Sequence, residues 1–413
     1  MSGELILIGG TVVTPHEEIR EGVVFCKDGL IQGVYARDEV GAIPRKGTVD
    51  LRDMMICPGL IDIHLHGALG VDFLDAGPDD YDRILRFHLT HGTTTIVPTL
   101  MTAPLEGMGD AARRIADWQA SGHVRGMIRG LHLEGPFLSP EKPGAHHVED
   151  LLLPNTGDLA YLMEASRGNI AILTMAPELE GAPELIRFAG KQGIIVSIGH
   201  SCASHDKVRE AIDLGANHAC HFFNAMGVFH HREPGVIGTL LIASHITAEL
   251  IVDGLHVHPI AAQILLRMLG ADRVVLVTDC SPLVGLEEGE YAVTGQGGHK
   301  RRVGRVEDDS QEGVDTMTYI KGRITGSRGC LAGSSLSLPQ AIKNCRDFGL
   351  APLSQAVAMA TTNPARLLCA EREIGRIAPG FRADITVLDQ ECNPRLVIKG
   401  GERVVEGVGE KTA

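Results

Sequence analysis

The chain has 413 residues, of which 44% are hydrophobic and 22% charged, and its formal net charge is -14 at pH 7. This composition is typical of a globular protein with one large domain, or a large domain and a small one. The acidic charge argues against a broad binding surface for nucleic acid or anionic membrane.

Nine cysteines without a CxxC pair favour a reduced, cytoplasmic protein over a disulfide framework. The N-terminus "MSGELILIGGTVVTP" lacks a basic region followed by a long apolar core, so we expect no secretory signal. We expect no membrane span either, because no stretch approaches the roughly 20 apolar residues that a span needs.

The two ends of the chain have similar patterns. The segment "GVVFCKDGLIQGVYA" places Lys27, Asp28 and Gly29 between two apolar runs, which is typical of a β-hairpin. Near the C-terminus, "ADITVLD" and "RLVIKGGERVVEG" also read as strands, the second pair joined around Gly400 and Gly401. We therefore predict a small β-sandwich domain built from residues 1–56 and 371–413, with a large domain, residues 57–370, inserted between them.

In the large domain, short apolar strands alternate with amphipathic helical patterns such as "SHDKVREAIDLG". This alternation is typical of parallel strands buried on both faces. Eight such units predict a closed (β/α)8 barrel of the TIM type. An open doubly wound sheet is the alternative, but no G-x-G-x-x-G follows the first strand. The predicted strands are residues 61–67, 94–100, 128–135, 169–178, 193–200, 216–224, 248–254 and 273–279.

Residues 286–328 interrupt this alternation. They are polar and rich in glycine, and we interpret them as a long excursion after the eighth strand, partly mobile or partly hairpin. The pattern "SSLSLPQAIKNCRDFG" then predicts a helix that resumes the barrel wall.

Ionisable side chains occupy the C-terminal ends of most predicted strands, where barrel enzymes carry their reactive groups. His64 and His66 end the first strand, and a spacing of two residues places both on one face. The others are Glu134 after the third strand, His200 after the fifth, His221 in the sixth, Asp253 and His256 after the seventh, and Asp279 at the end of the eighth.

Each of these positions alone is weak evidence, because a strand-terminal histidine is more often structural and a terminal carboxylate is more often a helix cap. Together, His64, His66, Glu134, His200 and His221 supply the nitrogen and oxygen ligands that suit Zn²⁺ or a similar divalent ion. Burying an ionised carboxylate is costly unless it is paired or bound to metal. The glutamate that ends the apolar run "IRGLHLEG" therefore predicts a cation at the barrel mouth.

The motifs "HLEGPF", "GHS", "HFFNAM", "REPG", "DGLH" and "TD", in this order, resemble the N-acetylglucosamine-6-phosphate deacetylases of the amidohydrolase superfamily. The segments "PGLIDIHLHG" and "GRIAPGFRADITVLD" extend the resemblance over residues 50–390. The resemblance implies metal-dependent hydrolysis of N-acetyl-D-glucosamine 6-phosphate to D-glucosamine 6-phosphate and acetate, in amino-sugar catabolism.

The same resemblance implies metal ligands. Glu134, His200 and His221 match the ligands of the metal site present throughout the family. His64 and His66 match a pair found in members that hold a second metal, so one or two ions per subunit, most simply Zn²⁺, are expected.

It also implies groups that act on the substrate. Asp279 matches the catalytic acid and base, and His146, in "KPGAHH", matches a substrate-contacting histidine that would help to stabilise the oxyanion. His256, Asn224 and Ala225 match further contacts to the sugar phosphate.

Arg232, in "REPG", matches an arginine that family dimers lend to the phosphate in the neighbouring active site, so we expect a homodimer. A guanidinium fork suits phosphate oxygens, whereas in isolation the stretch reads as a surface turn with an Arg–Glu pair. Two departures leave the fine specificity open. Cys280 follows the predicted catalytic aspartate where the family often has Ala or Ser, and the 286–328 excursion is longer than usual.

Rival readings stay open at this point. The substrate could instead be N-acetylgalactosamine 6-phosphate, another acylated amino sugar or a cyclic amide. A catalytically inactive barrel scaffold is a reading from another class of protein. Such scaffolds usually lose metal ligands or the aspartate of the eighth strand, and this chain keeps all of them.

Overall fold

The structure is a computed structural model that describes the chain except for residues 1–3, 16, 123–126, 295–301, 306–314 and 407–413. Its centre is a sheet of eight parallel strands in the order β15-β14-β13-β12-β11-β10-β9-β6. Each predicted strand is present, and most are shorter than predicted. They are β6 (Leu60–Leu65), β9 (Thr93–Met101), β10 (Leu131–Glu134), β11 (Ile170–Met175), β12 (Ile195–Ile198), β13 (His218–Ala219), β14 (Thr247–Leu250) and β15 (Val274–Leu276).

The first and last strands of this sheet meet and close it. A parallel bridge joins Leu65 to Cys280, just beyond the end of β15. The backbone N–H of Asp279 donates to the His64 carbonyl and that of His66 donates to the Cys280 carbonyl, both at 2.9 Å. The predicted (β/α)8 barrel is therefore confirmed. Its closure brings His64 and His66, at the end of the first strand, beside Asp279, which follows the eighth.

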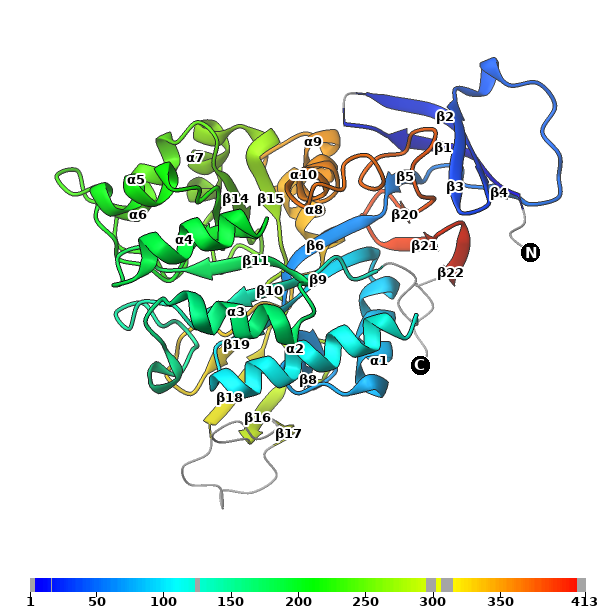
Figure 1. Cartoon of the computed structure of the whole chain (residues 1–413). Helices are drawn as coiled ribbons and strands as arrows, with labels where there is room; N and C mark the ends of the chain where they lie inside the picture. Colours follow the sequence, from blue (N-terminus) through cyan, green and yellow to red (C-terminus); the bar gives the residue numbers. More distant parts are fainter. Residues whose placement is uncertain (1–3, 16, 123–126, 295–301, 306–314, 407–413) are drawn as a thin grey trace.

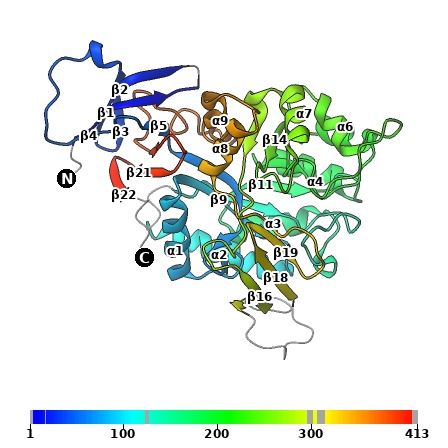
Figure 2. The same ribbon diagram turned by 180° about the vertical axis from the view of Figure 1, so that it is seen from behind.

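Helices cover the outside of the barrel (Figures 1 and 2). The amphipathic helices bury one apolar stripe; α4, for example, buries Leu185, Ile186 and Ala189. The helices are α1 (Pro78–Thr90), α2 (Leu105–Ala120), α3 (Thr156–Ala165), α4 (Ala182–Lys191), α5 (His205–Asp213), α6 (Gly235–Ile242), α7 (Pro259–Leu269), α8 (Leu338–Asp347), α9 (Leu353–Met359) and α10 (Thr362–Leu367), with 3-10 turns at Arg37–Glu39, Val148–Asp150 and Ala271–Arg273. Within the described residues, none of these helices has the length and apolar character to cross a membrane.

Both ends of the chain contribute to a second sheet, in which the blue strands β1–β5 lie beside the red strands β20–β22 (Figure 1). Its order is β22-β21-β20-β5-β1-β2-β3, and β4 pairs with β1. Its own core includes Leu7, Val24, Ile56, Ile385 and Ile398. The strands are β1 (Leu5–Val13), β2 (Glu18–Lys27), β3 (Leu30–Tyr35), β4 (Thr48–Asp50), β5 (Met55–Pro58), β20 (Ile385–Leu388), β21 (Pro394–Lys399) and β22 (Glu402–Glu406).

Both hairpins predicted in these terminal segments are present. Asp28 and Gly29 connect β2 to β3 with φ values of 53° and 78°, and Gly400 and Gly401 connect β21 to β22 with 58° and 79°. Two successive residues with positive φ are the signature of a type I′ turn, whose twist matches that of the flanking strands.

The predicted excursion is in part a four-stranded antiparallel sheet, which confirms its hairpin character. Its order is β17-β16-β18-β19, and it projects from the barrel away from the terminal sheet (Figures 1 and 2). Residues 295–301 and 306–314 of the excursion lie outside the described residues. The strands are β16 (Gly289–Thr294), β17 (Arg302–Arg305), β18 (Asp315–Ile320) and β19 (Arg323–Gly326); a further short pair is β7 (Gly67–Ala68) with β8 (Val71–Asp72).

The core of the terminal sheet can be tested with Ile385→Ala. Ile385 is fully buried, so the substitution removes apolar contacts and leaves a cavity, and we expect it to lower the free energy of unfolding by about 2–5 kcal/mol. Denaturant unfolding measures this change. The matched control is Ile320→Ala, because Ile320 is 51% exposed and its truncation should cost less than about 0.5 kcal/mol. Equal effects at the two positions would contradict the assigned core.

Candidate active site

A cavity of about 610 Å³ lies at the C-terminal ends of the barrel strands. Its wall contains nine of the eleven residues predicted to form the site. These are His66, Glu134, His146, His200, His221, Asn224, Ala225, His256 and Asp279. His64, also predicted, is fully buried and does not line the cavity, although its ring reaches the same cluster. The β16–β19 excursion contributes part of the wall through Val293, Met317 and Arg328.

Glu134 lies at the centre of the cluster. Its Oε1 is 3.1 Å from His200 Nε2 and 3.0 Å from His221 Nε2. The two Nε2 atoms are themselves 3.0 Å apart. Three strands, β10, β12 and β13, thus bring three ligand-type atoms together at the same point.

The tautomer of His200 indicates that a cation belongs between its Nε2 atom and the Glu134 carboxylate. Its Nδ1–H donates to the carbonyl oxygen of Lys142 at 2.9 Å, so in the neutral ring the Nε2 lone pair points at the Glu134 carboxylate. A lone pair facing a carboxylate is repulsive unless a cation lies between them. Ligands held at about 2.0–2.1 Å around tetrahedral Zn²⁺ lie about 3.3 Å apart, close to the spacing found here. These residues therefore fit a divalent metal ion.

A second group adjoins the first. His66 Nε2 lies 3.1 Å from Asp279 Oδ1, and His64 Nε2 lies 3.7 Å from the same oxygen. Glu134 is shared, with Oε2 at 3.5 Å from His66 Nε2 and Oε1 at 3.6 Å from His64 Nε2. Within the described residues, the buried His64 Nε2 has no hydrogen-bond partner. The arrangement offers two neighbouring cation positions with Glu134 between them.

Burial and neighbouring imidazoles set the charge of the two carboxylates. Burial alone would raise the pKa of Glu134, but electrostatic interaction with the His146 and His64 rings and close polar contacts with His146 and His200 hold it well below its ordinary value. Burial likewise opposes ionisation of Asp279, yet the hydrogen bond from His66 lowers the pKa of Asp279. Both groups are therefore anionic at neutral pH.

His146 is the neutral histidine of the cavity. The backbone N–H of Thr102 donates to its Nδ1 at 3.2 Å, so the ring proton is on Nε2, which lies 3.4 Å from Glu134 Oε2. Burial lowers the pKa of His146 to about 4. The side chain therefore presents an uncharged N–H to the cavity.

The outer residues are fixed by local hydrogen bonds. Asp253 Oδ2 accepts a hydrogen bond from His256 Nδ1 at 2.6 Å, which orients the ring at the cavity. The Asn224 side-chain amide donates to the His221 carbonyl at 3.1 Å. Asp253, noted in the sequence at the end of the seventh strand, therefore supports His256 from behind.

Several cavity residues have strained backbones. His200, Ala225 and Asp279 have φ values of 48°, 50° and 49°, in a region that residues other than glycine rarely adopt. Such strain persists only where the surrounding structure enforces it, and it concentrates at functional sites.

Arg232 is separate from these residues. It is exposed and its Nη1 lies 2.9 Å from His231 Nε2, and it is not part of the cavity wall. Its predicted role in a neighbouring subunit is therefore not tested by the single chain.

Sequence reasoning missed three fully buried residues beneath the cavity, Glu249, Asp62 and His132. Glu249 bonds the His64 ring, and Asp62 accepts from Thr278 Oγ1 at 2.6 Å. The available signal was a charged or ionisable residue inside an apolar strand, as in "AELIVDG", "IDIHLHG" and "GLHLEG". The sequence predicts strands in these segments and ligands only at the strand ends.

The central position of Glu134 predicts the effect of Glu134→Gln. A neutral amide is a poor ligand for Zn²⁺ and leaves the surrounding imidazoles without their anion, so metal affinity should fall by more than the about 100-fold that an outer-shell change costs. Metal content after dialysis measures it. Glu141→Gln is the control, because Glu141 lines the cavity without contacting the cluster. Full metal content in the Glu134 variant would refute the assignment.

Comparison with known proteins identifies the family of this chain. The Amidohydrolase family matches residues 55–404. An N-acetylgalactosamine-6-phosphate deacetylase from Escherichia coli O157:H7 is 35% identical over 87% of this chain and 89% of its own. An N-acetylglucosamine-6-phosphate deacetylase from Bacillus subtilis (strain 168) is 31% identical over 97% of both chains.

Among solved structures, the N-acetyl-D-glucosamine-6-phosphate deacetylase from Mycobacterium smegmatis superposes with a TM-score of 0.85 at 32% identity, covering 97% of this chain and 100% of that one. A mutant of the Mycobacterium smegmatis enzyme in complex with N-acetyl-D-glucosamine-6-phosphate gives 0.86 at 31% identity, over 98% and 100%. The chain therefore belongs to the amidohydrolase family and, within it, to the N-acetylglucosamine-6-phosphate deacetylases.

Proposed function

We propose that this protein is a metal-dependent deacetylase that hydrolyses N-acetyl-D-glucosamine 6-phosphate to D-glucosamine 6-phosphate and acetate. The observation that carries the proposal is that the anionic Asp279 lies at the mouth of the barrel, beside two candidate cation positions that have Glu134 in common. The relatives from Bacillus subtilis and Mycobacterium smegmatis, each named for this reaction, support the choice of substrate.

The geometry supports the assignment of residues to the metal. Glu134, His200 and His221 would hold one ion, and His64 and His66 would hold a second beside it, with Glu134 between them. A nitrogen-rich set with one carboxylate favours Zn²⁺. When bound, such an ion lowers the pKa of a coordinated water towards about 7 and so supplies a nucleophile at neutral pH.

Asp279 carries out the proton transfers. As an anion it accepts a proton from the attacking water at a carboxylate oxygen. It then donates that proton to the amide nitrogen of the substrate, because an amine leaves only when protonated. The water oxygen forms a bond to the acetyl carbon, the C–N bond breaks, and the products are acetate and the free amino sugar. One carboxylate thus acts first as base and then as acid.

His146 and the outer wall bind the substrate. His146 directs Nε2–H into the cavity, where it donates to the oxygen that becomes negative during attack. His256, Asn224 and Ala225 line the outer wall and contact the sugar phosphate.

The proposal includes a homodimer in which Arg232 reaches the phosphate bound by its neighbour. Exposed apolar side chains lie in the same part of the chain as Arg232, around α6 and α7, and the proposal assigns them to the dimer interface. They are Val228, Phe229, Ile242, Leu255, Ile260, Ile264 and Met268. We also place the enzyme in the cytoplasm, in keeping with nine free cysteines.

N-acetylgalactosamine 6-phosphate is the second candidate substrate, favoured by the 35% identity to the Escherichia coli O157:H7 relative. A coupled assay for released acetate, with both 6-phosphates and their unphosphorylated sugars, tests the proposal. Acetate release from the gluco compound with the higher kcat/KM supports the main assignment. A preference for the galacto compound selects the alternative, and no release by metal-loaded protein supports an inactive scaffold.

For Asp279→Asn we expect kcat to fall about 10²–10⁴-fold, because an amide can neither accept nor return the proton. The ion held by Glu134, His200 and His221 should remain, since these three residues are unchanged. Steady-state kinetics and metal analysis on one sample measure both. Substantial turnover in a variant with full metal would remove Asp279 from the mechanism.

For Arg232→Ala we expect KM for the phosphorylated sugar to rise about 10–100-fold, because charge-assisted hydrogen bonds are worth about 1.5–3 kcal/mol. Hydrolysis of the unphosphorylated sugar should hardly change. Arg83→Ala is the control, as Arg83 is an exposed residue of α1 paired with Asp80. Unaltered discrimination between the two sugars would eliminate the phosphate role.

A further inference from the structure

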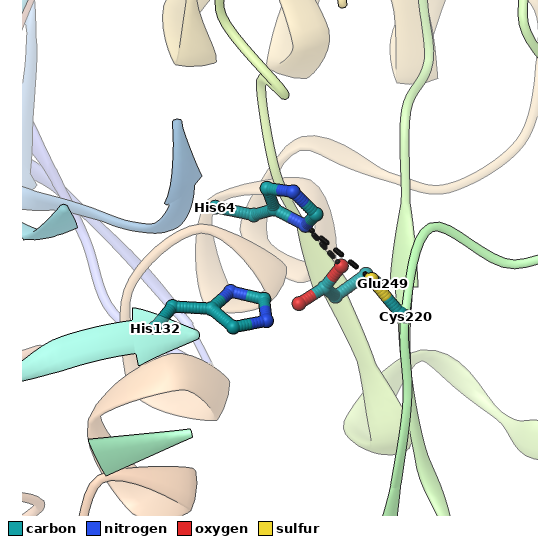
Figure 3. A group of neighbouring side chains, drawn as sticks. All are labelled: His64, His132, Cys220 and Glu249. Carbon is teal, nitrogen blue, oxygen red and sulfur yellow. Dashed lines mark hydrogen bonds and ion pairs between the residues drawn. The ribbon is translucent and has the colours of Figure 1, made fainter. Parts of the chain in front are cut away.

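A buried polar cluster lies beneath the cavity. It consists of His64, His132, Cys220 and Glu249, whose ligand-type atoms all lie within 4.8 Å of one another (Figure 3). All four residues are buried, and none lines the cavity. Two readings are possible: a third metal site, or a layer of hydrogen bonds that holds the site above.

The hydrogen bonds argue against a third metal site. His132 Nδ1 lies 3.1 Å from the Ile63 carbonyl and its Nε2 lies 2.8 Å from Thr174 Oγ1, so both ring nitrogens are occupied. Glu249 Oε1 lies 3.2 Å from His218 Nε2. These atoms already have protein partners and leave no free set of lone pairs for an ion.

Glu249 instead connects the two predicted metal positions. Its Oε2 accepts from His64 Nδ1–H at 2.8 Å, and the same oxygen accepts from the backbone N–H of His221 at 2.8 Å. His221 belongs to the first ligand group and His64 to the second. Figure 3 shows the Glu249 carboxylate turned to the inner edge of the His64 ring.

The bond to Nδ1 determines the tautomer of His64. With the proton held on Nδ1, the lone pair is on Nε2, the nitrogen that faces Glu134 and Asp279 at 3.6 and 3.7 Å. This is the orientation that a metal ligand needs, and a carboxylate behind an imidazole also raises the basicity of the ligating nitrogen. Cys220 Sγ also lies 3.6 Å from His64 Nδ1, but a thiol can donate or accept and so selects neither tautomer, whereas the Glu249 carboxylate can only accept.

A buried anion at this position has a cost that packing alone does not justify. An apolar side chain would fill β14 without desolvating a charge. The Glu249 oxygens instead accept from His64 Nδ1–H and from the His221 N–H, and one lies 3.2 Å from His218 Nε2. The polar side chain is therefore explained by its hydrogen bond to a ring that would bind metal.

We propose that Glu249 is a positioning residue that fixes His64 as a metal ligand and thereby determines whether the protein holds one ion or two. The proposal rests on the metal site of the proposed function, and it assigns Glu249 no contact with substrate. It predicts that loss of the carboxylate charge weakens the ion beside His64 and His66 and leaves the ion held by Glu134, His200 and His221 in place.

The test is Zn²⁺ titration of metal-free wild-type protein and of Glu249→Gln, with bound metal measured after dialysis. Glutamine keeps the shape and an oxygen acceptor, so the fold is preserved while the charge is lost. We expect two ions in the wild type and an about 10–100-fold weaker second ion in the variant, with the first affinity unchanged. The matched control is Glu178→Gln, because Glu178 accepts from Ser201 Oγ and the Cys202 N–H but bonds no ligand ring.

Other results would overturn the proposal. These are two ions bound normally by Glu249→Gln, an equal loss of both ions, the same loss in Glu178→Gln, or a single ion in the wild type. The readout is metal binding, so it is independent of the deacetylation assay. Failure to release acetate would count against the proposed function, whereas a normal second ion in the variant would count only against the role of Glu249.

A measurement on the wild type keeps the proposal testable if the variant does not fold. In protein loaded with Co²⁺, the His64 Nδ1–H should give a paramagnetically shifted proton resonance that exchanges slowly with D₂O, because the ring is fully buried against Glu249. The resonance should be missing in His64→Asn. Its absence from the wild type would mean that Glu249 does not hold the Nδ1 proton.

Discussion

The site depends on one buried carboxylate placed among five imidazole rings. Glu134 lies within 3.0–3.6 Å of nitrogens from His64, His66, His146, His200 and His221. A charge with almost no exposure is stable only if positive partners surround it, and the rings crowd together only if they share an anion or a cation. The carboxylate and the imidazoles therefore require each other, and a divalent ion satisfies both.

The barrel makes this mutual arrangement possible. Parallel strands deliver their C-terminal ends to one rim, and closure between β6 and the end of β15 brings Asp279 beside His64 and His66. The support continues below the rim. Glu249 fixes a ring nitrogen, Asp62 ties the His64 N–H to Thr278, and Asp253 orients His256. His64, Asp279 and His256 thus have hydrogen-bonded partners or neighbours behind them, which hold the reactive atoms in place, whereas Nδ1 of His66 and of His221 has no partner within the described residues.

Much of the fold followed from local patterns. Short apolar runs, punctuated by glycine and followed by amphipathic helices, were enough to predict eight parallel strands, because strands buried on both faces must be apolar throughout. The turns at Asp28–Gly29 and Gly400–Gly401, each with two positive φ values, were also predictable, because turn-forming residues stand between two apolar runs in the local sequence. Strand ends were less accurate: β13 has two residues, since the ladder stops where the chain bends to present His221.

The sequence by itself determined which residue types stand at the strand ends, and hence the metal-type chemistry of the rim. Only the tertiary structure decided which nitrogen of each histidine faces inward, because that depends on partners remote in the chain, such as Lys142 for His200 and Glu249 for His64. It also decided that Glu249 lies under the site, since an acid within an apolar strand has no local signal of its partner. The position of a charged residue along a strand can be read from the local sequence, whereas the direction of its hydrogen bonds depends on packing against distant segments.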